Sequence, residues 1–398
     1  MISKKLLFIG AGQSQSAGIK KAKDLGHYVI SIDENPKSEG FLYSDKYFIM
    51  NIFDYGAIIS LAKKHGVDAA LSVSSDVCLE AVSVVNEAIS HPSLTKDQVK
   101  LATNKGQMRQ KLSASNHLCP KFFLCKSLED IVAVLHLIST PVVVKPVDSS
   151  GSRGVLYIDD KSDLVKLSEK VFSFSKTNEI IIEEFMEGLE VAVEAFIIDG
   201  NLVILCISDK VRTSPPFLLD TTVIFPSSQP KDVLQEIRNS LEEALKHLEF
   251  DNTPIHAEII ITNEGPKIVE IATRGAGFKV FTKIIPYVTG VDSLLVQIKL
   301  LLGESIEIQH IENNAACLKF FSGSEGVLKS VTGLDRINEN SSLEEIEIYP
   351  KIGDKIKNLE SGGDRIGHII TFSKNRNQAL TEANKIYNSV HIEIAKEI

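Results

Sequence analysis

The chain of 398 residues carries 43 lysines and arginines against 52 aspartates and glutamates, which gives a formal net charge of −9. This length is too great for one ordinary hydrophobic core, so two or three lobes are expected. The acidic balance and the lack of a basic cluster argue against a nucleic-acid surface, which normally needs clustered Lys and Arg.

The chain begins with a strand, a glycine turn, a helix and a second strand. The apolar run Leu6–Ile9 leads into Gly10-Ala11-Gly12, and the run Tyr28–Ile32 ends at Asp33. This order is typical of dinucleotide-binding folds. However, Gln15 stands where the third glycine of the G-x-G-x-x-G motif belongs. A dinucleotide-dependent oxidoreductase therefore stays the weaker interpretation, and the short apolar run does not predict a signal peptide or a membrane span.

A second strand-to-helix step follows at residues 69–89. The apolar run Ala69–Val73 predicts a strand, and residues 77–89 have helical apolar spacing. Asp76 lies at the junction, where it could contact a substrate or cap the helix.

A Ser- and Gly-rich loop follows the apolar strand at residues 141–144, which leads into Lys145. Backbone N–H groups and hydroxyls of such a loop can bind phosphate oxygens, with the lysine as a nearby charge. The spacing is not that of a Walker A loop, and a flexible connection is the alternative. The loop residues in question are Ser149, Ser150, Gly151, Ser152 and Gly154.

The segment 179–200 predicts two strands on either side of a polar hinge. The first strand ends in Glu184-Phe185-Met186, and Glu190 opens the second after a turn at Gly188. A broken strand can offer its backbone to an adenine edge, and a nearby carboxylate can accept ribose hydroxyls. A plain hairpin with a charged turn is the alternative. Beyond it, residues 209–226 are rich in Pro and Thr and are expected to form a loop that carries Lys210 and Arg212.

The segment 256–277 predicts a hairpin that carries two carboxylates. Alternation along a strand places His256 and Glu258 on one face, and Glu270 on one face with Arg274. Two carboxylates beside a nucleotide suit Mg²⁺ better than zinc. Solvent-facing glutamates are the alternative for an isolated pair.

The C-terminal part and the cysteines are the last two features of the sequence. The segment after residue 315 predicts a β-rich lobe, in which Arg365 either reaches the cleft or forms a surface ion pair. There is no C-x-x-C pair and no zinc signature, and unpaired thiols suit a reducing cytoplasm. The cysteines are Cys78, Cys119, Cys125, Cys206 and Cys317.

The order of these blocks resembles the ATP-grasp superfamily over nearly the whole chain. Within it the chain is similar to the branch that holds biotin carboxylase, the purine-pathway enzymes and the bacterial L-amino acid ligases. The resemblance implies an α/β fold with an N-terminal Rossmann-like domain (1–104), an ATP-grasp domain (105–310) with a mobile α+β lid (about 112–186), and a β-rich C-terminal lobe (311–398). It also makes a homodimer the first expectation.

The resemblance implies a role for each matching residue. Lys105 and Lys145 would contact the ATP phosphates, and the loop from Ser149 to Gly154 would close over them. Glu184, Phe185 and Met186 would hold the adenine, and Glu190 the ribose. Glu258 and Glu270 would bind Mg²⁺, or Mn²⁺ in its place, and Arg274 would act in catalysis. Substrate contacts would come from Asp76, Lys210, Arg212, His256, Arg274 and Gly277.

The implied activity is a carboxylate–amine ligase that uses ATP and Mg²⁺ on small-molecule substrates and passes through an acyl phosphate. One position departs from the pattern, because Ala272 stands where many members carry an asparagine ligand of the second metal ion. A carboxylase that uses bicarbonate and a catalytically silent nucleotide-binding module therefore remain alternatives.

Overall fold

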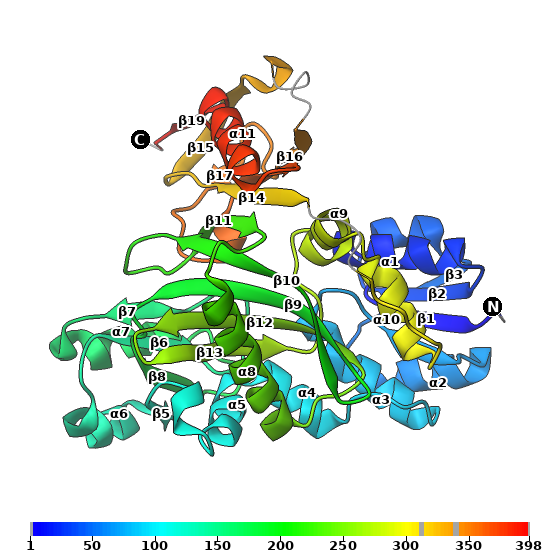
Figure 1. Ribbon diagram of the computed structural model, residues 1–398, viewed down its shortest axis with the longest axis horizontal. Helices are drawn as coiled ribbons and strands as arrows, with labels where there is room; N and C mark the ends of the chain where they lie inside the picture. The colour runs from blue at the N-terminus through cyan, green and yellow to red at the C-terminus, as the bar shows by residue number, and fades with distance from the viewer. Residues whose placement is uncertain (1–2, 310–313, 337–341, 397–398) are drawn as a thin grey trace.

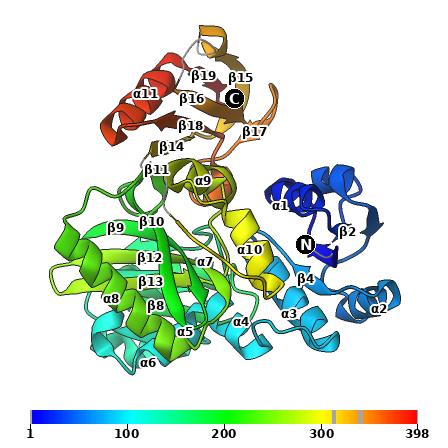
Figure 2. The ribbon, with the colours of Figure 1, turned by 45° about the vertical axis from the view of Figure 1, so that its right-hand side comes forward.

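The computed structural model describes residues 3–309, 314–336 and 342–396. An N-terminal α/β unit lies to one side, the C-terminal elements lie above, and a large sheet with a second, smaller sheet fills the remaining side (Figures 1 and 2). The N-terminal sheet is parallel, with the order β3-β2-β1-β4, whereas the pairings of the larger sheet are antiparallel.

The N-terminal unit has the predicted strand–helix alternation. Its elements are β1 (Lys5–Ile9), α1 (Gln13–Asp24), β2 (Tyr28–Asp33), η1 (Glu39–Tyr43), β3 (Lys46–Ile49), α2 (Tyr55–His65), β4 (Ala69–Leu71), η2 (Asp76–Cys78), α3 (Leu79–Ala88) and α4 (Lys96–Thr103). The strands are apolar because helices cover both faces of the sheet, and Leu7 and Phe8 are fully buried on opposite faces.

Side chains of the N-terminal unit itself occupy the space at its glycine turn. The amide of Gln15 donates to the carbonyl of Val73 at 2.9 Å, so this side chain lies at the turn instead of leaving it open. Asp33, which would reach a ribose in a dinucleotide fold, accepts the backbone N–H of Ala11 at 2.8 Å. Both contacts disfavour a bound dinucleotide here.

The smaller sheet has the order β5-β8-β6-β7 and forms a separate layer with its own core. We call this layer the lid, defined by residues 122–184. Its elements, with the helix that precedes them, are α5 (Lys105–Leu112), η3 (Asn116–Leu118), β5 (Phe122–Cys125), α6 (Leu128–Val134), η4 (Leu135–Leu137), β6 (Val142–Pro146), β7 (Leu156–Ile158), η5 (Lys161–Asp163), α7 (Leu164–Phe172) and β8 (Ile180–Glu184).

The large sheet has eight strands in the order β13-β12-β9-β10-β11-β14-β18-β16. It runs from the predicted glutamate hairpin directly into the C-terminal elements, because β11 pairs with β14. Its strands and covering helix are β9 (Leu189–Ile198), β10 (Asn201–Arg212), β11 (Asp220–Phe225), α8 (Lys231–Leu248), β12 (Thr253–Thr262), β13 (Gly265–Ala272), β14 (Ala315–Phe321), β16 (Leu343–Ile348) and β18 (Gly367–Ser373).

The structure answers two expectations about local structure, at residues 179–200 and 209–226. Strands β8 and β9 belong to different sheets, so the segment 179–200 is a hinge between layers and not a plain hairpin. The expected loop at residues 209–226 is wrong, because Lys210 and Arg212 lie on β10, and β10 pairs with β11. The Pro and Thr residues suggested a loop, but Pro215 and Pro216 lie in the short connection at 213–219 and Pro226 follows the end of β11. Pairing with β9 and β14 extends the two strands.

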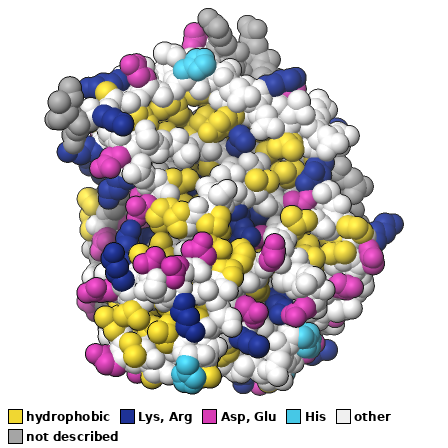
Figure 3. Space-filling model, turned by 90° about the vertical axis from the view of Figure 1, so that its left-hand side faces the viewer, with side chains coloured by type: hydrophobic (Ala, Val, Ile, Leu, Met, Phe, Trp, Pro, Cys, Tyr) yellow, Lys and Arg dark blue, Asp and Glu magenta, His cyan; other side chains and the backbone are white. Residues whose placement is uncertain are grey.

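The remaining elements connect the cleft to the C-terminal part. They are η6 (Val280–Ile284), α9 (Ile285–Thr289), α10 (Ser293–Leu301), β15 (Gly326–Thr332), η7 (Leu334–Arg336), β17 (Lys355–Ile356), η8 (Gly362–Asp364), α11 (Arg376–Ser389) and β19 (His391–Ala395). In the part of the chain that is described, no single helix is long and apolar enough to cross a membrane, and only the bent pair 280–289 and 293–301 passes by length and composition. On the face shown in Figure 3, basic and acidic side chains are interspersed.

Candidate active site

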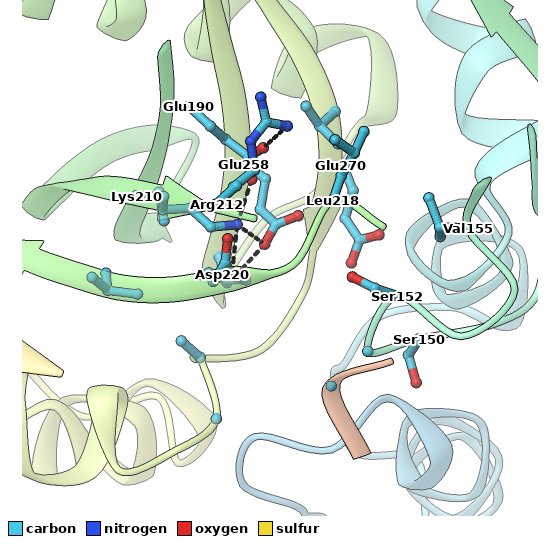
Figure 4. A pocket seen from close by; sticks show the side chains of 18 of the residues that line it. Ser150, Ser152, Val155, Glu190, Lys210, Arg212, Leu218, Asp220, Glu258 and Glu270 are labelled. Carbon is cyan, nitrogen blue, oxygen red and sulfur yellow. Dashed lines mark hydrogen bonds and ion pairs between the residues drawn. The ribbon is translucent and has the colours of Figure 1, made fainter. Parts of the chain in front are cut away.

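A cavity of about 340 Å³ lies where the large sheet, the lid, the N-terminal unit and the C-terminal part meet. Its size is within the range usual for small-molecule sites. All of the residues predicted from the sequence to form the site line this cavity except Gly154, which lines a neighbouring cavity instead. Figure 4 shows Ser150 and Ser152 on the loop facing the sheet residues across the cavity.

The two glutamates lie directly opposite each other on β12 and β13. Glu258 pairs with Glu270 in the strand register, and a bulge follows immediately because Ile259 pairs with Ile268. The bulge leaves Val269 outside the ladder, and its carbonyl accepts a hydrogen bond from Arg109 at 2.9 Å. The hairpin thus presents both carboxylates on one face.

Each of the two glutamates keeps one free oxygen. Lys105 binds one oxygen of Glu270 at 2.9 Å, and Lys210 binds one oxygen of Glu258 at 2.6 Å. Among the described residues, the second oxygen of each carboxylate has no hydrogen-bond partner, although both residues line the cavity. Two carboxylate oxygens open to a cavity are hard ligands of the kind that Mg²⁺ prefers, so these residues fit the implied metal ion.

Lys105 connects this glutamate pair to the Ser/Gly loop. It lies at the first residue of α5, where its ammonium also donates to the carbonyl of Ser149 at 2.7 Å. The loop turns sharply, since Gly151, Ser152 and Gly154 have φ of +65°, +58° and +74°. Gly151 also accepts the N–H of Gly362 at 2.9 Å, so the C-terminal part contacts the loop tip.

Lys145 lies near the end of β6 and belongs to a buried triad of ion-paired side chains. Its ammonium binds Glu183 at 2.6 Å, and Arg109 binds the other oxygen of Glu183 at 2.5 Å. Burial opposes ionisation of Glu183, but Arg109 and Lys145 outweigh it and hold the pKa of Glu183 below its usual value. Sequence reasoning did not place Arg109 or Glu183 in the site. The sequence holds an indication for Glu183 but none for Arg109. Side chains alternate along a strand, so Glu183 lies on the opposite face from Ile182 and Glu184.

The predicted adenine segment lies at the hinge between β8 and β9. The N–H groups of Glu184 and Phe185 are used within the protein, by the carbonyls of Lys121 and Pro141. Among the described residues, the N–H of Met186 has no such partner, and Met186 lines the cavity. Of the N–H groups of Glu184, Phe185 and Met186, only that of Met186 is therefore open to a ligand.

A group of carboxylates surrounds Lys210 in the middle of the cleft. Lys210 contacts Glu190, Asp220 and Glu258, and Arg212 binds Glu190 at 2.6 Å (Figure 4). Burial alone would lower the pKa of Lys210, but these carboxylates hold it well above its usual value. Both cations predicted to receive a substrate carboxylate are thus already neutralised by protein carboxylates.

His256 and Arg274 each have a carboxylate partner as well. Arg274 donates from two nitrogens to Asp76, both at 2.7 Å, which joins the hairpin to the N-terminal unit. His256 contacts Glu194, whose other oxygen accepts the N–H of Ala276. Glu194 was not predicted, although it shares a strand face with Glu190 and alternation could have found it.

We expect the charge of His256 to make stability depend on pH. Burial opposes the charge, but Glu194 and Glu258 raise the pKa of His256 from 6.5 to about 9. A raised pKa stabilises the fold below pH 6.5, and this contribution is lost as the pH rises through the raised value. Relative to His256→Gln, the wild type should therefore lose on the order of 3 kcal/mol of unfolding free energy between pH 6.5 and 9. Urea unfolding across this range measures it, and a difference independent of pH would contradict the assignment.

Comparisons with known proteins agree with this architecture. A family model described as "ATP-grasp domain" matches residues 138–282, and one described as "L-amino acid ligase C-terminal domain 2" matches residues 319–395. The chain is 20% identical to an L-amino acid ligase from Bacillus licheniformis, with a TM-score of 0.89 over 100% of both chains. It is also 20% identical to an N5-carboxyaminoimidazole ribonucleotide synthetase from Thermotoga maritima, with a TM-score of 0.76 over 98% of this chain and 100% of that one.

The curated relatives are longer than this chain. An uncharacterized protein, y4rH, from Sinorhizobium fredii is 23% identical over 75% of this chain and 63% of its own length. The carbamoyl phosphate synthase large chain from Clostridium acetobutylicum is 21% identical over 76% of this chain and 30% of its own length. The chain thus matches less than two thirds of either relative. The predicted α/β ATP-grasp fold is confirmed by the matching domain and by the structural similarity.

Proposed function

Because this chain belongs to the ATP-grasp proteins and carries a C-terminal domain of the L-amino acid ligase type, we propose that it is an ATP-dependent carboxylate–amine ligase. The observation that carries the proposal is that the Lys105 ammonium contacts both the Ser/Gly loop and Glu270. A nucleotide phosphate group bound at the loop would therefore lie beside the two opposed glutamates. The amino acid ligase among the structural relatives supports an amino acid as one substrate.

The residues divide between the two ends of ATP. Lys105, Lys145 and the loop at 149–154 would hold the phosphates. Burial lowers the pKa of Lys145, and its ion pair with Glu183 acts in the opposite direction. Met186 would meet the adenine edge with its N–H, and Glu190 the ribose hydroxyls. Glu258 and Glu270 would hold Mg²⁺, which supplies positive charge to the transferring phosphoryl oxygens.

The proposed reaction has two steps. An oxygen of the substrate carboxylate attacks the γ-phosphorus, its bond to the ADP oxygen breaks, and an acyl phosphate forms. The amine nitrogen then attacks the acyl carbon and phosphate leaves, so that amide, ADP, phosphate and one proton result from the carboxylate, the ammonium form of the amine and ATP. Arg274, held by Asp76, would steady charge on the acyl group, and positioning supplies most of the rate.

Trapping the acyl phosphate tests this proposal. Wild-type protein with ATP, Mg²⁺ and hydroxylamine should convert one member of a panel of amino acids and dicarboxylates to its hydroxamate. With that carboxylate labelled by ¹⁸O and an amine supplied, one labelled oxygen should appear in the released phosphate. Release of AMP, or phosphate without label, would rule out the mechanism.

The same panel separates the alternatives. Phosphate release that needs bicarbonate and no amino acid would indicate a carboxylase. ATP binding without turnover on any member would indicate a silent module, the interpretation to which Ala272 gives weight. Ala272 pairs with His256 in the strand register, and its methyl side chain has no atom that could bind a metal ion.

A further inference from the structure

The cations that line the cleft are almost all paired with protein carboxylates. Each partnership described above places a lysine, arginine or histidine within ion-pair distance of an acidic side chain. The pairs are Lys105–Glu270, Lys145–Glu183, Lys210–Glu258, Arg212–Glu190, His256–Glu194 and Arg274–Asp76. Arg153 is an exposed residue of the loop. Arg365 is therefore the cavity-lining cation among the described residues that is neither exposed nor paired with a carboxylate.

Arg365 lines the cavity without a carboxylate partner among the described residues. Its guanidinium carbon lies 3.7 Å from the ring centre of Phe320 and 5.1 Å from that of Phe278. One terminal nitrogen donates to the backbone carbonyl of Asp220 at 2.8 Å, while the buried Nε has no partner. Burial lowers the pKa of Arg365, although Asp220 acts in the opposite direction.

An arginine fixed in this way is prepared to receive an anion. The two rings and the carbonyl hold the plane of the guanidinium, so little side-chain freedom is lost when a ligand binds. A guanidinium donor without a partner is costly, and a ligand carboxylate that reached it would supply a charge-assisted hydrogen bond. The adjacent wall is apolar, since Leu318 and Phe320 line the same cavity, and Phe278 is 41% exposed.

We propose that Arg365 receives the carboxylate of the amine substrate, which makes this substrate an amino acid and the product a peptide with a free carboxylate. The inference rests on the proposed ligase function. The phosphates and the reacting carboxylate belong at the other end, where Lys105, Lys145 and the loop lie. An amino acid bound by Arg365 would lay its carbon skeleton along Phe278 and Phe320.

The inference assigns to Arg365 the role that the sequence suggested for Lys210 and Arg212. Those two cations have no free charge, because Glu190, Asp220 and Glu258 neutralise them. Arg365 is contributed by the C-terminal part, just after the turn whose Gly362 contacts the Ser/Gly loop. The amine site would therefore be complete only when the lid meets the C-terminal part.

Acceptor selectivity tests the inference. Wild type, Arg365→Met and Arg365→Lys are compared with L-alanine, L-alaninamide and ethylamine as acceptors, using the carboxylate identified by the hydroxamate assay. We expect Arg365→Met to raise the KM for L-alanine about 10- to 100-fold, the range of one charge-assisted pair, with little change for the two acceptors without a carboxylate. Arg365→Lys should recover part of the preference for L-alanine.

Hydroxylamine separates this inference from the proposed function, because it needs no carboxylate receptor. If wild type forms no hydroxamate, the ligase itself fails. If it does, and Arg365→Met leaves the KM for L-alanine unchanged, or instead raises the KM for ATP or the first carboxylate, the inference is overturned. Arg238→Met, a half-exposed arginine on α8, serves as the matched control, and thermal unfolding checks that each variant folds.

Discussion

Glu270→Gln should lower ADP release by at least about 100-fold, the loss typical of removing one preorganised group at a developing charge. The substitution keeps the size of the side chain but removes the negative charge that faces Glu258 and binds Lys105. With one carboxylate left, the pair can no longer hold Mg²⁺ between two strands. Steady-state ADP release at saturating Mg-ATP measures the loss, and calorimetry shows whether ATP still binds.

Glu264→Gln is the matched control for this variant. Glu264 lies at the turn of the same hairpin, with 71% of its side chain exposed, and its carboxylate forms an ion pair with Lys267. It should keep wild-type ADP release. If Glu270→Gln is as active as this control, then the hairpin carboxylates are not metal ligands and the alternative of solvent-facing glutamates holds.

Glu183→Gln should destabilise the protein by about 3–5 kcal/mol, the cost of leaving buried charges without their partner. Glu183 is only 2% exposed and neutralises both Arg109 and Lys145. Because its pKa is lowered, the stabilisation is present above the ordinary carboxyl pKa and is lost as the pH falls. Urea unfolding followed by circular dichroism at neutral pH measures the change.

The control here is Glu187→Gln, an exposed glutamate at the same hinge. Its effect should stay within about 0.5 kcal/mol, as is usual for surface positions. A loss below about 1 kcal/mol for Glu183→Gln would mean that water or rearrangement neutralises Arg109 and Lys145.

The strand-borne part of the site could be predicted from the sequence, and the ion pairs could not. Alternation predicts His256 and Glu258 on one face, and the register places Glu258 opposite Glu270. The partners Asp76 and Arg274 are 198 residues apart, so no local pattern joins them. Arg109 is a similar case, because a helix outside the sheet brings it under the cleft.

The expectation for residues 209–226 failed for a related reason. Composition indicated a loop, but β11 gains its pairing from β14, nearly a hundred residues further along the chain. The expected domain boundary near residue 310 separates these same two strands. Periodicity reports which face of a strand is apolar, and it does not report which neighbour completes the sheet.

The continuous eight-stranded sheet means that the C-terminal part is not a detachable module. If the chain were cut near residue 310, β11 would become an edge strand, with the backbone groups that now pair with β14 exposed. Exposed edges of this kind are templates for intermolecular pairing, so such a fragment would aggregate. Chimeras that exchange specificity with related ligases would therefore need to carry β14 with the donor segment, or keep it with the host, but never omit it.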